Sequence, residues 1–254
     1  MDSTIGWLLM LVLLGAAVGS FLNVCIFRIP QGISIVSPLS HCPSCGRRIR
    51  VRDNLPVISY FFLGGCCRDC GARISWRYPL VESATAAGAG LLFLKYGLTP
   101  ALAAAFLFLC FLIVIAFIDL DQRMIPHVLT LSGIPLFALL AVLAMELQML
   151  DVFLGAMIGA AVLYFVAVYY ETLTGREGMG GGDINLLAML GAFLGWQALP
   201  FILLAASFIG SVVGVILILA KGKTLHDAVP FGPFLCLSAA LYLYCDRLRL
   251  MQFP

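Results

Sequence analysis

Long apolar runs constrain this chain more than any other feature of its sequence. The run from Leu186 to Ala220 is 35 residues long, whereas a helix crosses a bilayer with about 20 residues. Apolar residues make up 62% of the 254 residues and charged residues 11%, against about 45–50% and about 25% in soluble domains. We therefore expect an all-α polytopic membrane protein. Soluble enzymes, disordered chains and nucleic-acid-binding domains are excluded, as are outer-membrane barrels, whose apolar residues alternate along each strand.

Eight apolar segments are expected to cross the membrane as helices. The longest run is divided in two because Trp196, Gln197 and Pro200 interrupt it; merging its halves gives the alternative of seven spans. The second segment is weak because Glu82 lies at its edge. The expected segments are Gly6–Phe27, Ser83–Leu94 with its flanks, Ala101–Ile118, Val128–Met145, Val152–Tyr170, two within Leu186–Ala220, and Ala228–Cys245.

The only long polar segment, Arg28–Pro79, carries eight arginines against Asp53 and Asp69. Basic residues collect in cytoplasmic loops, so we expect this loop in the cytoplasm and the N-terminus outside. With eight spans, 12 of the 15 basic residues fall on the loop's side of the membrane. The first segment has no basic flank and is expected to remain as a helix, unlike a cleaved signal peptide. The expected organisation is a first helix at 1–27, a loop at 28–79 and a seven-helix transmembrane domain at 80–254.

Four of the nine cysteines form two similar motifs in this loop. Cys42 and Cys45, and then Cys67 and Cys70, are each spaced as C-x2-C and followed by glycine. Such paired motifs are typical of zinc ribbons, in which four thiolates close a structural site around one ion. Disulfides are the rival interpretation, which a cytosolic loop disfavours because thiols stay reduced there. Cys66 could replace Cys67 as a ligand, although the spacing favours Cys67.

Two aspartates at the edges of apolar segments are the candidates for chemistry, because membrane carboxylates are costly and usually functional. Asp119 ends the third segment, and Asp183 begins the sixth. Two crossings separate them, so both lie on the same side of the membrane, and the long loop lies on that side too. A pair of carboxylates in a partly dry site can share one proton and act as acid and base. Interfacial charges, a helix cap at Asp183 and a transporter's cation site are the alternatives that spacing leaves open.

These motifs, in this order, resemble the bacterial prepilin peptidases, the type IV leader peptidases of the GxGD aspartyl protease class. The resemblance spans nearly the whole chain. The residues that carry it are Gly19-Ser20-Phe21-Leu22-Asn23-Val24, Arg28-Ile29-Pro30, the two cysteine pairs, Tyr78-Pro79-Leu80-Val81-Glu82, Ile118-Asp119, Ile125-Pro126, Gly180-Gly181-Gly182-Asp183 and Phe231-Gly232-Pro233-Phe234.

The resemblance implies that Asp119 and Asp183 are the catalytic pair, supported by Gly180 and Gly182 in the loop before Asp183. It favours Asp119 over Asp121, because the family's aspartate stands seven residues before the proline. The family often has Asp or Asn after that proline, where this chain has His127.

The resemblance also implies two activities in the bacterial inner membrane. The enzyme would cut the basic leader from type IV prepilins or pseudopilins and then N-methylate the new terminus with S-adenosylmethionine. No residues can be assigned to that cofactor, because no glycine-rich nucleotide-binding motif is present. The implied metal is Zn²⁺, held by Cys42, Cys45, Cys67 and Cys70. An ion-coupled transporter and a zinc-stabilised membrane scaffold are the rival functions.

Overall fold

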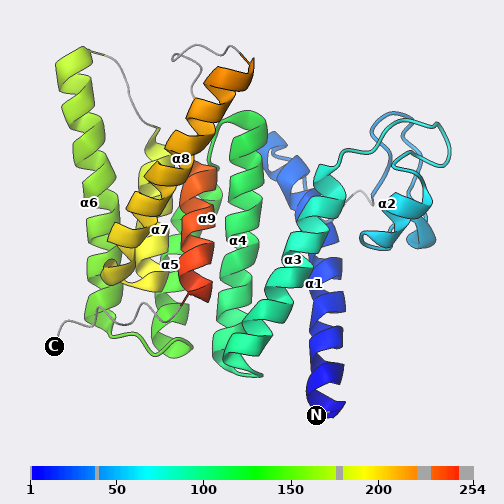
Figure 1. Cartoon of the computed structure of the whole chain (residues 1–254), viewed down its shortest axis with the longest axis horizontal. Coiled ribbons are helices and arrows are strands. Elements are labelled where there is room, and N and C mark those ends of the chain that lie inside the picture. Colours follow the sequence, from blue (N-terminus) through cyan, green and yellow to red (C-terminus); the bar gives the residue numbers. More distant parts are fainter. Residues whose placement is uncertain (1, 38–39, 176–179, 222–229, 246–254) are drawn as a thin grey trace. The chain divides into compact units, whose positions relative to one another are not determined.

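The computed structural model describes residues 2–37, 40–175, 180–221 and 230–245 (Figure 1). The regular elements in these residues are all helices, which confirms the expected all-α membrane fold. Eight of them are long and overlap the eight expected apolar segments, of which the last begins at residues 228–229, outside the described residues. They are α1 (Asp2–Arg28), α3 (Arg77–Tyr96), α4 (Pro100–Gln122), α5 (His127–Leu143), α6 (Met149–Thr174), α7 (Gly181–Leu194), α8 (Leu199–Lys221) and α9 (Gly232–Tyr244).

Within the described residues, four helical stretches are long and apolar enough to cross a membrane: Thr4–Gln31, Pro100–Gln122, Met149–Thr174 and Trp196–Ala220. Helices α5, α7 and α9 are shorter but also apolar. The 35-residue run is divided where expected: α7 ends at Leu194, and Gly195 has a left-handed φ of 82° before the short helix η3 (Trp196–Ala198). The chain forms two compact units, Met1–Leu102 and Ala103–Pro254. The expected domain at 80–254 ends in residues 246–254, which lie outside the described residues.

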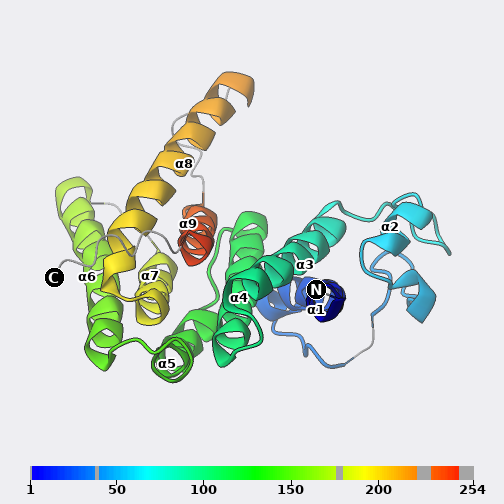
Figure 2. The same ribbon diagram turned by 60° about the horizontal axis from the view of Figure 1, so that its bottom comes forward.

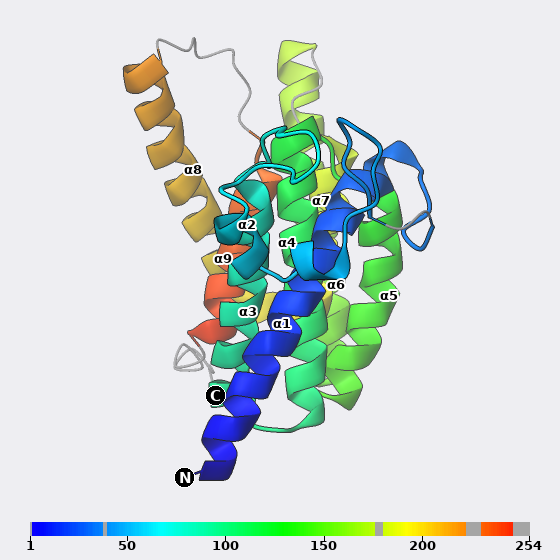
Figure 3. The ribbon, with the colours of Figure 1, turned by 90° about the vertical axis from the view of Figure 1, so that its right-hand side faces the viewer.

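The first unit is built on two antiparallel helices, α1 and α3, which lie side by side (Figures 1 and 3). Their backbones approach closely through small residues, as is common for helices in lipid. A Cβ on Gly15 would lie 2.8 Å from the Cβ of Ala89, and a Cβ on Gly19 would lie 2.7 Å from the Cα of Glu82. Glycine at positions 15 and 19 is therefore a packing requirement of this helix pair.

The loop between α1 and α3 contains short helical turns and two tight cysteine turns. Its helices are η1 (Ile29–Gln31), η2 (Val51–Asp53) and α2 (Ile58–Phe62). Isolated antiparallel bridges join His41 to Arg48 and Cys66 to Arg73, one bridge at each cysteine motif. The short helix α2 was not expected from the sequence.

In the second unit α7 is the central helix and packs against α5, α6, α8 and α9 (Figure 2). Its residues 186–193 are all buried. Close contact with α6 depends on glycine, because a Cβ on Gly155 would collide with the carbonyl of Gly191. Phe108, Phe137 and Phe193 pack ring against ring in the core of this unit, with centroids 4.2 to 5.5 Å apart.

The helix directions bring several helix ends together in this unit. The end of α4 and the beginnings of α5, α7 and α9 lie at the same end of the bundle, the upper end in Figure 1. Both candidate aspartates are at this end. The fold thus places Asp119 and Asp183 at the same end of the bundle, where their carboxylates can act together.

Candidate active site and metal centre

Asp119 lies in the last turn of α4 and is buried, with 5% of its surface exposed. Asp121, two residues later on the same helix, is exposed. Residues two apart on a helix point to different faces. The burial of Asp119 and the exposure of Asp121 agree with the motif resemblance, which favoured Asp119. Arg123 then adopts a left-handed φ of 55°, and its amide donates to the carbonyl of Asp119 (2.8 Å), which ends the helix.

Asp183 is the third residue of α7, and Gly180 is the cap of that helix. The amide of Asp183 donates to the carbonyl of Gly180 (3.2 Å). Its carboxylate is half-buried, and the buried Oδ1 has no hydrogen-bond partner within the part of the chain that the structure describes. A buried carboxylate oxygen without a partner is costly, and it leaves a position for water or substrate to bond.

Ile125 joins the helix ends that carry the two aspartates. A Cβ on Gly182 would lie 2.8 Å from the Cβ of Ile125, and one on Gly232 would lie 2.9 Å from its Cδ1. The beginnings of α7 and α9 therefore both pack on this one side chain, just after the end of α4. Asp119 and Asp183 are close enough for their charges to interact.

The beginning of α9 contributes two groups that sequence reasoning did not assign to the site. The backbone amide of Gly232 donates toward the carboxylate of Asp119, and a Cβ at Gly232 would lie 2.5 Å from Oδ2 of Asp119. One turn later, the thiol of Cys236 is buried near both aspartates. Gly232 belongs to the Phe231–Phe234 motif, so a signal was present, but nothing in the sequence connected that motif to Asp119.

A hydrogen bond between α5 and α7 fixes the turn that carries Asp183. The Nδ2 of Asn185 lies 3.2 Å from the Nδ1 of His127, the first residue of α5. Asn185 was also missed by sequence reasoning, although a polar residue inside an apolar helix is a signal that could have found it. His127 thus contacts the helix of Asp183 and has a structural partner.

The four motif cysteines come together in the first unit, as the spacing predicts. The sulfur atoms of Cys42, Cys45, Cys67 and Cys70 all lie within 4.8 Å of one another. The sulfurs of Cys42 and Cys70 are 3.9 Å apart, and tetrahedral zinc with bonds of about 2.3 Å separates its sulfurs by about 3.8 Å. The cluster therefore has the donor set and dimensions to bind a metal ion.

The two cysteine motifs have the same backbone geometry, which explains the position of Cys66. Gly46 donates its amide to the carbonyl of Cys42 (2.8 Å), and Gly71 donates to Cys67 (2.9 Å), with φ of 70° and 71° at these glycines. Cys66 occupies the place that His41 has in the first motif, just outside the turn. Its thiol does not belong to the four-sulfur cluster, in agreement with the C-x2-C spacing.

Amide groups of the first turn favour a thiolate there. The backbone amide of Cys45 is the main cause that lowers the pKa of the Cys42 thiol to about 6. A thiolate is the form that binds metal. The geometry of the turn thus prepares the first cysteine to act as a ligand.

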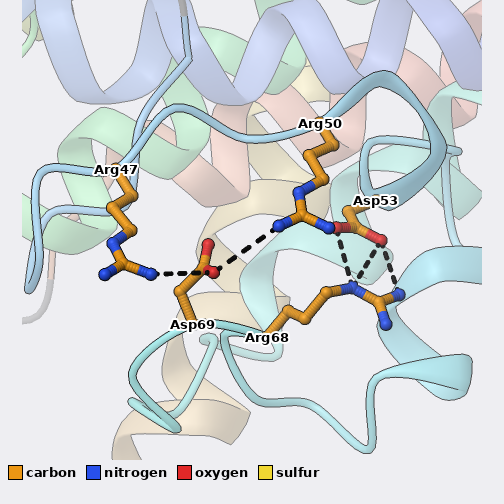
Figure 4. A network of polar contacts seen from close by, with 5 residues as sticks. All are labelled: Arg47, Arg50, Asp53, Arg68 and Asp69. Atoms are coloured by element: carbon orange, nitrogen blue, oxygen red, sulfur yellow. Dashed lines mark hydrogen bonds and ion pairs between the residues drawn. The ribbon is translucent and has the colours of Figure 1, made fainter.

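Ion pairs connect the two cysteine turns to each other and to η2 (Figure 4). Asp69 in the second turn accepts from Arg47 in the first at 3.1 Å, with Arg50 at 3.9 Å. Arg68 binds both oxygens of Asp53, with the shortest contact at 2.7 Å, and this pairing lowers the pKa of Asp53. The ion pair stabilises the loop at pH values above the ordinary carboxylate pKa. This stabilisation is lost as the pH falls through the lowered pKa of Asp53.

Fold and site together define a multi-pass membrane protein that joins two carboxylates at one end of a helix bundle and carries, in a separate loop, a four-thiol cluster with the dimensions of a metal site. Comparison with known proteins gives the family. The bacterial peptidase A24 N-terminal domain matches residues 13–96, and the type IV leader peptidase family matches residues 106–215. The chain belongs to the type IV leader peptidase family, as the motifs indicated. No solved structure matches the chain significantly.

Several curated relatives match most of the chain in sequence. A prepilin leader peptidase/N-methyltransferase of Pseudomonas aeruginosa is 36% identical and covers 94% of this chain and 90% of its own length. A prepilin leader peptidase/N-methyltransferase of Dickeya chrysanthemi is 39% identical, and the match covers 95% of this chain and 94% of the relative. A prepilin leader peptidase/N-methyltransferase of Myxococcus xanthus is 44% identical, and the match covers 84% of this chain and 64% of the relative. These matches extend over both units, so the family relation applies to the loop as well as to the helix bundle.

Proposed function

We propose that this protein is a membrane aspartyl peptidase that removes the basic leader of type IV prepilins or pseudopilins and then N-methylates the new terminus. The observation that carries the peptidase proposal is the meeting of Asp119 and Asp183 at one end of the second unit. The names of the relatives support the substrate class and the second activity. Gly180 and Gly182 would support the turn that presents Asp183.

In the proposed mechanism the two carboxylates share one proton. The ionised aspartate takes a proton from a water molecule, whose oxygen attacks the scissile carbonyl, while the protonated partner donates a hydrogen bond to the carbonyl oxygen. The tetrahedral intermediate collapses when the amide nitrogen takes up a proton and the peptide bond breaks. The unpartnered Oδ1 of Asp183 supports this use, because it can bond to water or substrate.

We propose that Cys42, Cys45, Cys67 and Cys70 bind one structural Zn²⁺. Four sulfurs at zinc-like separations support the ion, and four thiolates leave no open position for catalysis. S-adenosylmethionine supplies the methyl group in the second activity, and we assign no residues of this chain to it. We also propose that the loop 28–79 and both aspartates face the cytoplasm and that the N-terminus is outside, which the arginine distribution supports.

A purified enzyme assay tests the proposed function. The full chain in detergent is incubated with a model prepilin and S-adenosylmethionine, and the product is measured by mass spectrometry. We expect loss of the leader and a gain of about 14 Da, the mass of one added CH₂. A processed product without the gain would remove the methyltransferase, whereas an intact prepilin would contradict the peptidase and favour a transporter or a scaffold.

A further inference from the structure

The short helix α2 exposes large apolar side chains although it lies outside the long spanning helices. Ile58, Phe61 and Phe62 are exposed, and Phe62 shows 87% of its surface. Leu55 just before the helix and Trp76 just before α3 are exposed as well. We call these five side chains the aromatic patch. Phe61 and Trp76 are in ring contact, with centroids 6.3 Å apart, and exposed apolar side chains that gather in this way mark a site of interaction.

The backbone that carries this patch is held in a defined conformation. The amide of Val57 donates to Oε2 of Glu82 on α3 at 2.6 Å. Val57 has a φ of 61°, a strained conformation for a β-branched residue that persists only where the surroundings hold it. The amide of Leu55 donates to Oγ of Ser59 at 2.9 Å, and that hydroxyl donates to the carbonyl of Arg52 at 3.0 Å. The patch is therefore presented by an ordered turn.

Contacts with α1 and α3 set the depth of this turn. Glu82, which holds Val57, lies beside Gly19 of α1. Gly19 is eight residues before Phe27, the end of the apolar part of α1, which corresponds to about 12 Å along the helix axis. The ring of Tyr60 packs on Trp76 with centroids 5.0 Å apart. Trp is enriched at the membrane–water interface, and Trp76 directly precedes α3. We therefore place α2 at the depth of the leaflet on this side.

Positive charge accompanies the aromatic surface. A cavity of about 470 Å³ is lined by Tyr60, Phe61 and Trp76 and also by Arg73. The acidic residues Asp53 and Asp69 of the same loop are engaged by other arginines. Apolar rings beside an arginine at this depth match a phospholipid with an anionic headgroup, whose acyl chain packs on rings and whose phosphate binds a guanidinium.

We propose that the aromatic patch inserts into the bilayer leaflet on the side of the arginine-rich loop and binds anionic phospholipid there, with Arg73 as the headgroup partner. The insertion anchors the loop at a fixed height on the α1–α3 pair. This role is independent of the peptidase chemistry and of which side of the membrane the loop occupies.

A single-tryptophan probe at position 62 tests the insertion. The background replaces Trp7, Trp76 and Trp196 by Phe, and the probes are Phe62→Trp, Phe208→Trp on exposed α8 as the lipid reference and Arg48→Trp in the first cysteine turn as the water reference. In nanodiscs, we expect lipids brominated in the upper acyl chain to quench the Phe62→Trp probe. We expect acrylamide to quench it several-fold less than the Arg48→Trp probe. Equal acrylamide quenching at positions 48 and 62, without bromine quenching at 62, would overturn the proposal.

Lipid class is tested with Trp76 as the native probe, in a chain that carries Trp7→Phe and Trp196→Phe. Brominated phosphatidylglycerol and brominated phosphatidylcholine are compared at the same mole fraction. We expect enrichment of the anionic lipid by about fivefold at Arg73. Arg73→Gln removes the preference, whereas the matched control Arg48→Gln retains it. Equal quenching by both lipids in the unchanged loop, or protection of position 62 only when a prepilin is added, would contradict a lipid site and indicate a protein-docking surface.

Discussion

Ile125 has the central position in the candidate site, because the glycines that begin α7 and α9 both pack on its side chain. The placement of Asp183 therefore depends on how closely Gly182 approaches Ile125. The placement of Asp119 depends in the same way on Gly232, whose amide faces the carboxylate. Close contacts of these two glycines thus define the candidate site as much as the aspartates do.

The two glycines before Asp183 are predicted to differ in their tolerance of a methyl group. Gly182→Ala places a Cβ 2.8 Å from the Cβ of Ile125, whereas the nearest atom to a Cβ at Gly181 is Cε1 of His127 at 3.9 Å. We expect Gly182→Ala to lower the kcat of leader cleavage about 10²-fold, the effect of a displacement of about 1 Å. Gly181→Ala should stay near wild type. Equal activities in a steady-state cleavage assay would show that the contact with Ile125 does not position Asp183.

Residue types and spacing selected Asp119, Asp183 and the four clustered cysteines as candidates, but not their neighbours. Asp119 was chosen over Asp121 from a motif, and its burial agrees with that choice. Asn185, Gly232 and Cys236 were missed because their roles arise only where α5, α7 and α9 meet. Such long-range contacts leave no local pattern in a single sequence.

The helices themselves were predictable because a bilayer imposes them: apolar backbone without water must satisfy its own hydrogen bonds. The second segment was weak in the sequence, yet α3 is a regular helix of 20 residues. Its Glu82 is buried and bonded to the amide of Val57, and that partner comes from a loop turn that no apolar pattern indicates. The short helix α2 was also missed, because no apolar pattern in the loop indicates it.

Helix packing in the second unit is predicted to depend on Gly155 of α6. A Cβ at Gly155 collides with the carbonyl of Gly191 on α7, and rigid backbone has little room to move. We expect Gly155→Ala to destabilise the protein by about 1–3 kcal/mol, as overpacking does, and to lower the midpoint of thermal unfolding in detergent. Gly214→Ala on α8, where no atom lies within 4 Å of a Cβ, is the matched control and should not lower it. Equal midpoints would contradict this packing.

Metal binding by the loop is predicted to need Cys45 and Cys70 but not Cys66. The first two belong to the four-sulfur cluster, and Cys66 lies outside the turn. Elemental analysis of the purified protein should find about one zinc per chain in wild type and in Cys66→Ser, and much less in Cys45→Ser and Cys70→Ser. A metal-free wild type would contradict the zinc proposal, and loss of zinc in Cys66→Ser would move the ligand assignment from Cys67 to Cys66.

The chain as a whole combines a helix bundle that gathers two carboxylates with a loop that gathers four thiols and carries ion pairs. Counting apolar segments predicted the eight long helices, and it predicted that Asp119 and Asp183 lie at the same end of the bundle. It did not predict the packing order of the helices, because every apolar helix face in lipid looks alike in sequence. Small residues at Gly15, Gly19 and Gly155 select the partners instead, through close backbone contact.

Asp119 and Asp183 are proposed to act as one catalytic pair, and the activity of their variants tests this most directly. Leader cleavage is therefore measured for purified wild type, Asp119→Asn, Asp183→Asn and the exposed control Asp121→Asn, with thermal unfolding to verify that each variant is folded. We expect each of the first two variants to lose about 10³-fold or more in kcat, as members of a catalytic unit do, while Asp121→Asn stays near wild type. Cleavage retained by a folded Asp119→Asn or Asp183→Asn variant would contradict a catalytic pair of these two aspartates.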